Sequence, residues 1–83
     1  MTHVIKKNKA FISYEDMGDW VYLHQWTNKD KSLDAIELGH RFLRLIKKPI
    51  IASSLYKKVI SVAKRYGFKE YKKLGDRTFI IRN

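Results

Sequence analysis

The chain contains no cysteine, which excludes disulfide frameworks, thiolate metal sites and cysteine nucleophiles. No run approaches the roughly 18 apolar residues that a membrane-spanning helix needs, and no signal-peptide pattern opens the sequence. We therefore expect a cytoplasmic protein with no membrane partner. Hydrophobic residues make up 45% of the 83 positions, which is enough for one core. Residues 1–83 are predicted to form a single domain.

Acidic residues are scarce in the second half of the chain. Residues 1–40 carry five Lys/Arg against six Asp/Glu, whereas residues 41–83 carry thirteen against two. The net charge of +10 therefore resides in the second half. Such asymmetry favours an anionic partner, either nucleic acid or an acidic protein, although it also suits a basic surface that merely keeps the protein soluble.

The clearest structural pattern is a helix at residues 54–66. Apolar residues recur there at the spacing of one helical face: Leu55, Val59, Val62, Ala63 and Tyr66. Ser54 is expected to cap the helix by accepting a backbone hydrogen bond. Gly67 suits the left-handed position that ends a helix, and Phe68 is expected to fold back onto the last turn.

The first third of the chain predicts strands. Residues 1–14 form strand interrupted by a turn at 7–9, and a second turn follows at 16–19. Residues 20–26 are rich in aromatic and β-branched residues, as strands are. We expect residues 11–14 and 20–26 to form an antiparallel pair.

A second helix is predicted at residues 33–48, with Ser32 as its cap, acidic residues near its start and lysines at its end. The apolar run 50–52 between the two helices indicates a buried strand and a parallel crossover. Residues 69–82 predict a terminal hairpin. The fold class is therefore α/β (α+β), with a mixed, mainly antiparallel sheet, two helices and the order β-β-β-α-β-α-β-β.

A winged helix is the second fold hypothesis. Residues 33–48 would be its first helix, 54–66 its recognition helix and 69–82 its wing, which would make the chain a DNA-binding protein. The long apolar connection between the helices and the three preceding strands weigh against it.

The predicted order, closing with the sequence KKPIIASSLYKKVISVAKRYGFKEYKKLGDRTFIIRN, resembles the C-terminal two thirds of the GNAT family of N-acetyltransferases. The resemblance implies that residues 20–26 are the central strand that meets the cofactor. It also implies that the family's first strand and the two helices after it are absent. The chain is similar as well to small GNAT-like proteins of bacteriophages, including internal virion proteins, which would place it in the host cytoplasm or the virion.

Two departures from the family pattern argue against catalysis. The family binds the coenzyme A pyrophosphate with an Arg/Gln-x-x-Gly-x-Gly/Ala loop at a helix start. When Gly39 is aligned with the last glycine of that loop, Asp34 stands in place of the Arg/Gln and Glu37 in place of the first glycine. Their carboxylates would repel the phosphates of the cofactor. The tyrosine that the resemblance implies as proton donor to the thiolate is replaced by Ala63. We therefore expect no cofactor and no catalytic residues.

Other chemistry-bearing residues have structural interpretations. The three histidines, His3, His24 and His40, lack metal-ligand spacing, so we expect no metal. His24 lies within a strand and is better explained by packing than as a general base. Trp20, Tyr22 and Trp26 form either a base-stacking platform or, for at least half of the set, part of the core.

The function most consistent with the sequence is that of a non-catalytic accessory or inhibitor protein of phage type. It would dock a basic surface onto an acidic macromolecule, either nucleic acid or a host or virion protein. The surface is predicted to comprise Lys57, Lys58, Lys64, Arg65, Lys72, Lys73 and Arg77.

Two alternatives remain. The first is a small acetyl-CoA-dependent N-acetyltransferase, with acetyl-CoA held by Trp26–Asn28 and the helix start at Ser32. The second is the winged-helix DNA-binding protein. The broad apolar face of residues 33–48 also leaves room for a homodimer.

Overall fold

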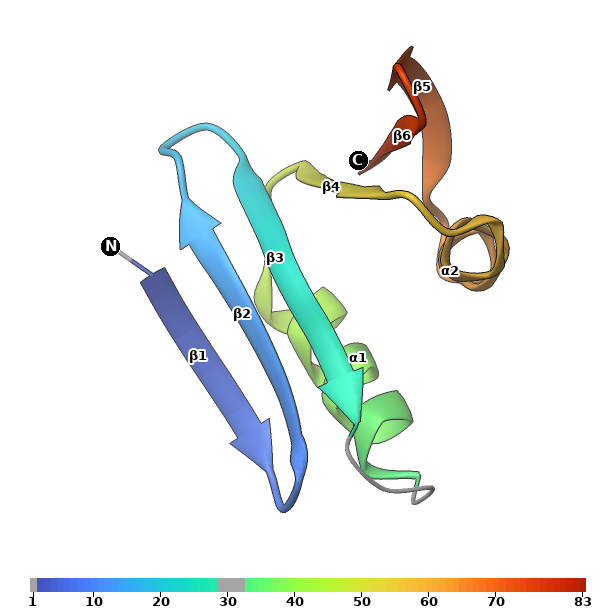
Figure 1. The fold of residues 1–83 in the computed structure, drawn as a ribbon. Helices are drawn as coiled ribbons and strands as arrows, with labels where there is room; N and C mark the ends of the chain where they lie inside the picture. The colour runs from blue at the N-terminus through green and yellow to red at the C-terminus, as the bar shows by residue number, and fades with distance from the viewer. Residues whose placement is uncertain (1, 29–32) are drawn as a thin grey trace.

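The computed structural model describes residues 2–28 and 33–83. Its strands are β1 (Thr2–Lys7), β2 (Ala10–Asp16), β3 (Val21–Asn28), β4 (Ile50–Ser54), β5 (Lys69–Leu74) and β6 (Arg77–Arg82), and its helices are α1 (Asp34–Leu45) and α2 (Lys57–Lys64) (Figure 1). The strands form one sheet in the order β1-β2-β3-β4-β6-β5, antiparallel except between β3 and β4. The predicted element order, mixed sheet and parallel crossover are confirmed.

Both turns predicted in the first third of the chain are present. Asn8 takes a positive φ of 55° in the two-residue connection between β1 and β2, as such hairpins require. After β2, the Asp16 carboxylate accepts the Gly18 N–H at 2.9 Å and the Lys48 ammonium at 2.8 Å. The Lys48 hydrogen bond, followed by that from Gly18, lowers the pKa of Asp16 below its usual value of 3.8.

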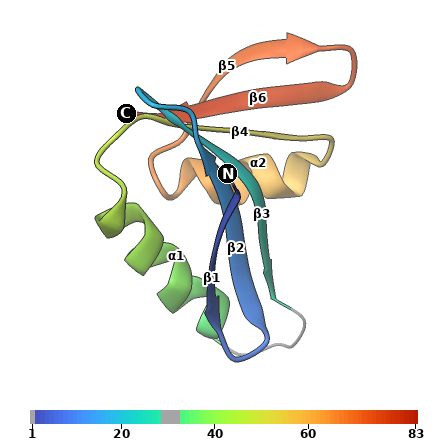
Figure 2. The ribbon, with the colours of Figure 1, turned by 90° about the vertical axis from the view of Figure 1, so that its left-hand side faces the viewer.

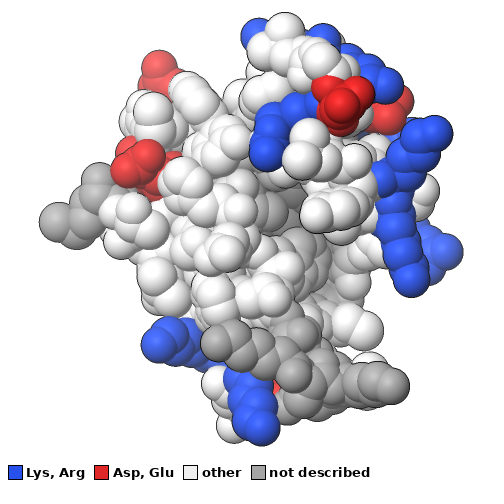
Figure 3. Space-filling model, viewed as in Figure 1, with Lys and Arg blue, Asp and Glu red and all other residues white. Residues whose placement is uncertain are grey.

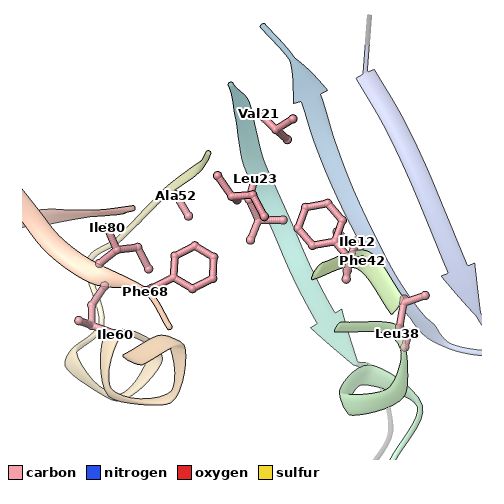
Figure 4. Close-up of a cluster of buried hydrophobic side chains, with 11 residues drawn as sticks. Ile12, Val21, Leu23, Leu38, Phe42, Ala52, Ile60, Phe68 and Ile80 are labelled. Carbon is pink, nitrogen blue, oxygen red and sulfur yellow. The ribbon is translucent and has the colours of Figure 1, made fainter. Parts of the chain in front are cut away.

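The core lies between the sheet and its helices. α1 packs on β1, β2 and β3, and α2 packs on β4 (Figure 2). Phe42 from α1 and Ile60 from α2 belong to one cluster of buried apolar side chains. In Figure 4, Leu23 of β3 lies between the group around Phe42 and the group around Phe68. Both helices therefore contribute to the same core.

The end of α2 follows the predicted pattern. Gly67 has a positive φ of 92°, and its N–H donates to the Lys64 carbonyl at 3.2 Å. The Phe68 N–H reaches back to the Ala63 carbonyl at 3.3 Å. This pair of bonds is the Schellman arrangement, and it directs the Phe68 ring into the core, where it is 3% exposed.

The start of α2 differs from the prediction. Ser53 and Ser54 continue β4 by pairing with β6, so this segment is extended and the helix begins only at Lys57. The N-cap is Tyr56, which makes no side-chain capping bond. The Ser54 hydroxyl instead accepts the Tyr56 N–H at 3.1 Å. The assignment of Ser54 as the cap was therefore wrong.

Helix α1 is shorter than predicted at its C-terminal end. Ile46 is already extended, with ψ of 119°, and Pro49 disfavours helical geometry in the residue before it. Lys48 therefore lies outside the helix and pairs with Asp16. The predicted cap Ser32 lies outside the described residues.

The winged-helix alternative was wrong. Residues 50–54 form a strand with β3 on one side and β6 on the other, so they are not the turn of a helix-turn-helix unit. The terminal hairpin is likewise part of the sheet. Within the described part of the chain, neither helix has the length and apolar character needed to cross a membrane.

Candidate functional site: the cleft between β3 and β4

Among the described strands, β3 and β4 are the one parallel pair, and they separate soon after their pairing begins. β3 and β4 pair at Val21–Ile50 and Tyr22–Ile51 and then diverge. Beyond Tyr22, no described strand pairs with the edge of β3 that faces β4. Backbone N–H and C=O groups along this edge are therefore available to a ligand.

A cleft of about 700 Å³ occupies the space between the diverging strands. Leu23 and Trp26 line it from β3, and Ala52 and Ser54 line it from β4. The apolar side of α2 forms another wall through Tyr56, Val59, Val62 and Ala63. Its volume is within the range of about 300–1,000 Å³ typical of small-molecule sites.

Trp26 and Tyr66 meet at the cleft, from β3 and from the turn after α2. Their ring centroids are 5.1 Å apart with an edge-to-face geometry. The indole Nε1 donates to the Ala35 carbonyl at 2.9 Å, which fixes the ring over α1. Gly39 provides the space, because a Cβ there would lie 1.9 Å from the indole Cζ2.

The predicted aromatic row on β3 is divided between two faces. A register shift in the β2–β3 pairing places Ile12 opposite Trp26 but Tyr14 opposite Leu23, so β3 has one extra residue there. Trp26 therefore faces α1, while the Tyr22 and His24 rings contact each other at 5.0 Å. His24 also lies 3.7 Å from the Glu15 carboxylate. No single platform of Trp20, Tyr22 and Trp26 exists.

The alignment of residues 34–39 with the phosphate-binding loop of the family was wrong. Asp34–Gly39 lies entirely within α1 rather than before it. Moreover, Glu37 forms an ion pair with Lys7, and the Asn8 amide donates to Asp34 at 3.0 Å. The β1–β2 hairpin thus engages both carboxylates. Because the sequence has no glycine between Gly18 and Gly39, a glycine-containing loop is also absent from the segment before α1.

The position that the resemblance gives to a proton-donating tyrosine lies on the cleft wall. Ala63 lines the cleft and offers no ionisable group. Tyr66, one turn further on, also lines it, but its ring packs against Trp26 and His40. Across the described ranges 2–28 and 33–83, no cluster of His, Asp and Glu has the geometry of a metal site.

The seven predicted docking residues are all exposed and lie on α2, just after it and on the β5–β6 hairpin. The hairpin residues do not share one face. Lys72 pairs with Phe79, whereas Lys73 pairs with Thr78 and so points to the opposite side of the sheet. The Lys72 ammonium lies 5.8 Å from the centre of the Phe79 ring, and Arg77 donates to the Ser53 hydroxyl at 2.9 Å.

The predicted docking residues on and after α2 also lie on different parts of the surface. Lys58 lines the cleft, while Arg65 lines a second cavity beside α1. Lys64 lies 3.7 Å from Glu70 and is the only one of the seven with an acidic partner among the described residues. Figure 3 shows blue side chains, with some red ones beside them, at the hairpin and α2 side of the molecule, further blue side chains at the lower edge, and a largely uncharged centre.

Sequence reasoning missed the apolar walls of the cleft. It placed Val59 and Val62 on the apolar face of the helix, yet they are 50% and 46% exposed, whereas Ile60, absent from that predicted face, is 5% exposed. The adjacent apolar residues Val59 and Ile60 could have indicated this. Neighbouring residues point to different sides of a helix, so an apolar surface that includes both is wider than one buried face.

Comparison with known proteins gives the fold. No protein-family model and no curated protein matches the chain. Among solved structures, an acyl-CoA N-acyltransferase from Pseudomonas aeruginosa matches 96% of the chain with a TM-score of 0.75 and 16% identity. A Bacteroides thetaiotaomicron protein, assigned to the GNAT family as an acetyltransferase, matches 99% with a TM-score of 0.65 and 20% identity.

The chain spans 66% and 60% of the lengths of these two proteins. At this identity the likeness establishes the fold. The element order and the mixed, mainly antiparallel sheet with two helices agree with the resemblance seen in the sequence. The chain therefore has a GNAT-like fold.

Proposed function

We propose that this chain is a non-catalytic binding protein that docks its basic C-terminal half onto an acidic macromolecule. The observation that carries the proposal is the set of exposed cations on α2 and the β5–β6 hairpin, which have almost no acidic partners among the described residues. Like charges held close together repel, and a polyanion relieves that repulsion. In a phage-type accessory or inhibitor protein, the partner would be nucleic acid or an acidic host or virion protein.

The residues at the cleft support a binding role without chemistry. Ala63 has no proton to donate, and the Tyr66 ring is packed between Trp26 and His40. The start of α1 also lacks the glycines that would let backbone N–H groups approach a pyrophosphate.

A double charge reversal tests the docking surface. Lys57→Glu/Lys58→Glu is expected to weaken binding to a short DNA duplex, or to poly-glutamate as a model acidic protein, by at least about 10-fold, measured by fluorescence anisotropy. The matched control is Lys6→Glu/Lys9→Glu, which changes the net charge equally at two exposed lysines of the N-terminal half. Binding to DNA should also fall steeply between roughly 50 and 200 mM salt.

The two probes separate the partner classes. Tight, salt-sensitive binding to duplex DNA supports nucleic acid, whereas binding to poly-glutamate alone supports an acidic protein. An equal loss in both variants would show that net charge, and not this surface, determines binding. Failure to bind either probe contradicts the proposal.

The cleft favours acyl-CoA binding as a second candidate function. It is mainly apolar and runs beside an open strand edge, so it suits an extended ligand that carries amide groups. One of the two proteins of similar fold is an acyl-CoA N-acyltransferase. Under this candidate, Lys58 would pair with a ligand phosphate, because it is the one Lys or Arg among the described residues that line the cleft.

Thermal unfolding with acetyl-CoA tests the second candidate. Ligand at 100 times its dissociation constant stabilises by about 2.7 kcal/mol, which for this size of domain raises Tm by roughly 10 °C or more. Val59→Glu, within the cleft, should abolish the shift. Val4→Glu is the matched control because Val4 and Val59 are both 50% exposed. An unchanged Tm would exclude the candidate.

A further inference from the structure

A second cavity, of about 820 Å³ and open to solvent, lies between α1, the end of α2 and β6. Its lining includes residues from all three elements: His40, Arg41, Arg44, Arg65, Tyr66 and Arg82. Residues distant in sequence thus place four arginine side chains around one space. Only Arg65 belongs to the predicted docking surface, so the cavity is a separate feature.

None of these arginines has an acidic partner among the described residues. Glu37 also lines the cavity, but its carboxylate is already paired with Lys7. The lining therefore carries an uncompensated charge of four guanidinium groups. Bringing such groups together costs electrostatic free energy unless an anion binds between them.

Part of this lining is fixed in position. The Arg82 Nε donates to the Tyr66 carbonyl at 2.8 Å, and the side chain passes close to Gly67. This bond leaves the terminal guanidinium nitrogens of Arg82 free to donate elsewhere. Arg41 and Arg44 are three residues apart on α1, so they project from the same side of the helix.

We propose that this cavity binds a polyphosphate chain of two or more linked phosphates. Guanidinium groups pair with phosphate oxygens through two parallel hydrogen bonds. A single phosphate or carboxylate carries too little charge to balance the four arginines that line the cavity. The exposed His40 ring, whose centroid lies 5.5 Å from that of Tyr66, lines the same cavity and offers a surface for a base.

Calorimetric titration with tripolyphosphate and with ATP tests the proposal at about 0.15 M ionic strength. Arg41→Gln/Arg44→Gln is expected to weaken binding by at least about 10-fold. Both side chains are exposed and without acidic partners in the described chain, so the variant should fold normally. Tighter binding of ATP than of tripolyphosphate identifies a nucleotide site. Equal or tighter binding of tripolyphosphate identifies an inorganic polyphosphate site.

The matched control is Lys6→Gln/Lys9→Gln, which removes two charges from exposed lysines of the N-terminal half that do not line the cavity. It should retain the affinity of the unmodified protein. An equal loss in both variants would show that net charge alone attracts the anion, and this result would overturn the proposal. Absence of binding by both probes would overturn it as well, while leaving the docking of a macromolecule at α2 and the hairpin unaffected.

Discussion

Replacing Phe42 with alanine is expected to lower the free energy of unfolding by about 3–5 kcal/mol. Phe42 is fully buried on α1, and its ring centroid lies 5.2 Å from that of Tyr14 on β2. The substitution leaves a cavity where the helix meets the sheet. Domains of this size are stabilised by only about 0.05–0.15 kcal/mol per residue, so the variant should be close to unfolding. Urea unfolding followed by circular dichroism measures the loss.

Leu45→Ala is the control for this substitution. Leu45 is the last residue of the same helix and is 56% exposed, so its truncation should change stability by no more than about 0.5 kcal/mol. The two variants remove apolar side chains from one helix and differ mainly in burial. A cost for Phe42→Ala as small as that for Leu45→Ala would contradict the placement of the core.

The features that the sequence predicted well depend on neighbouring residues. The end of α2 follows from Gly67-Phe68, since a glycine tolerates the left-handed conformation and the next side chain returns to the helix. The β1–β2 and β5–β6 turns follow from Asn8 and Gly75, both of which have positive φ. These turn and helix-end preferences depend on a few adjacent residues, so they do not depend on how distant parts of the chain pack.

The features that could not be predicted depend on distant partners. Ser54 belongs to β4 because Thr78 pairs with it from β6, and this pairing overrides the local preference of serine for a helix start. Trp26 faces α1 because the register shift near Ser13 reverses the alternation of β3. A simple alternating pattern gives no sign of such a shift.

The candidate site was only partly accessible to sequence reasoning for the same reason. The cleft exists because β3 and β4 pair at Val21 and Tyr22 and then separate, which is a property of the assembled sheet. The cavity beside α1 collects Arg44, Arg65 and Arg82 from three elements. In the sequence Arg44 and Arg82 were part of a general positive charge and Arg65 was assigned to the docking surface, so only the fold distinguishes the cavity from that surface.

The structure also changes the electrostatic argument about the start of α1. Repulsion of a diphosphate by Asp34 and Glu37 was expected, but Lys7 and Asn8 engage these carboxylates from the β1–β2 hairpin. The absence of glycine before α1 is therefore the stronger argument against pyrophosphate binding. The acetyl-CoA experiment decides between a retained cleft function and a scaffold that works through its charged surfaces.

Gly39→Ala is expected to destabilise the protein by about 1–3 kcal/mol through overpacking. In a helix interior, alanine is normally more favourable than glycine by about 1 kcal/mol. The expected change in stability therefore has the opposite sign to that given by helix propensity. The reason is that an added Cβ would lie 1.9 Å from the Trp26 Cζ2, on a ring anchored to the Ala35 carbonyl. Either α1 or the indole must move, and movement of the indole also disturbs its contact with Tyr66 at the cleft.

A double-mutant cycle isolates this contact. Trp26→Phe removes the part of the ring that lies over Gly39, so in that background Gly39→Ala should be neutral or stabilising, as helix propensity alone predicts. Chemical denaturation of the four proteins gives the coupling free energy between the two positions. An equal loss of stability from Gly39→Ala in both backgrounds would contradict this explanation. It would mean that the Trp26 indole is not the reason that position 39 requires glycine.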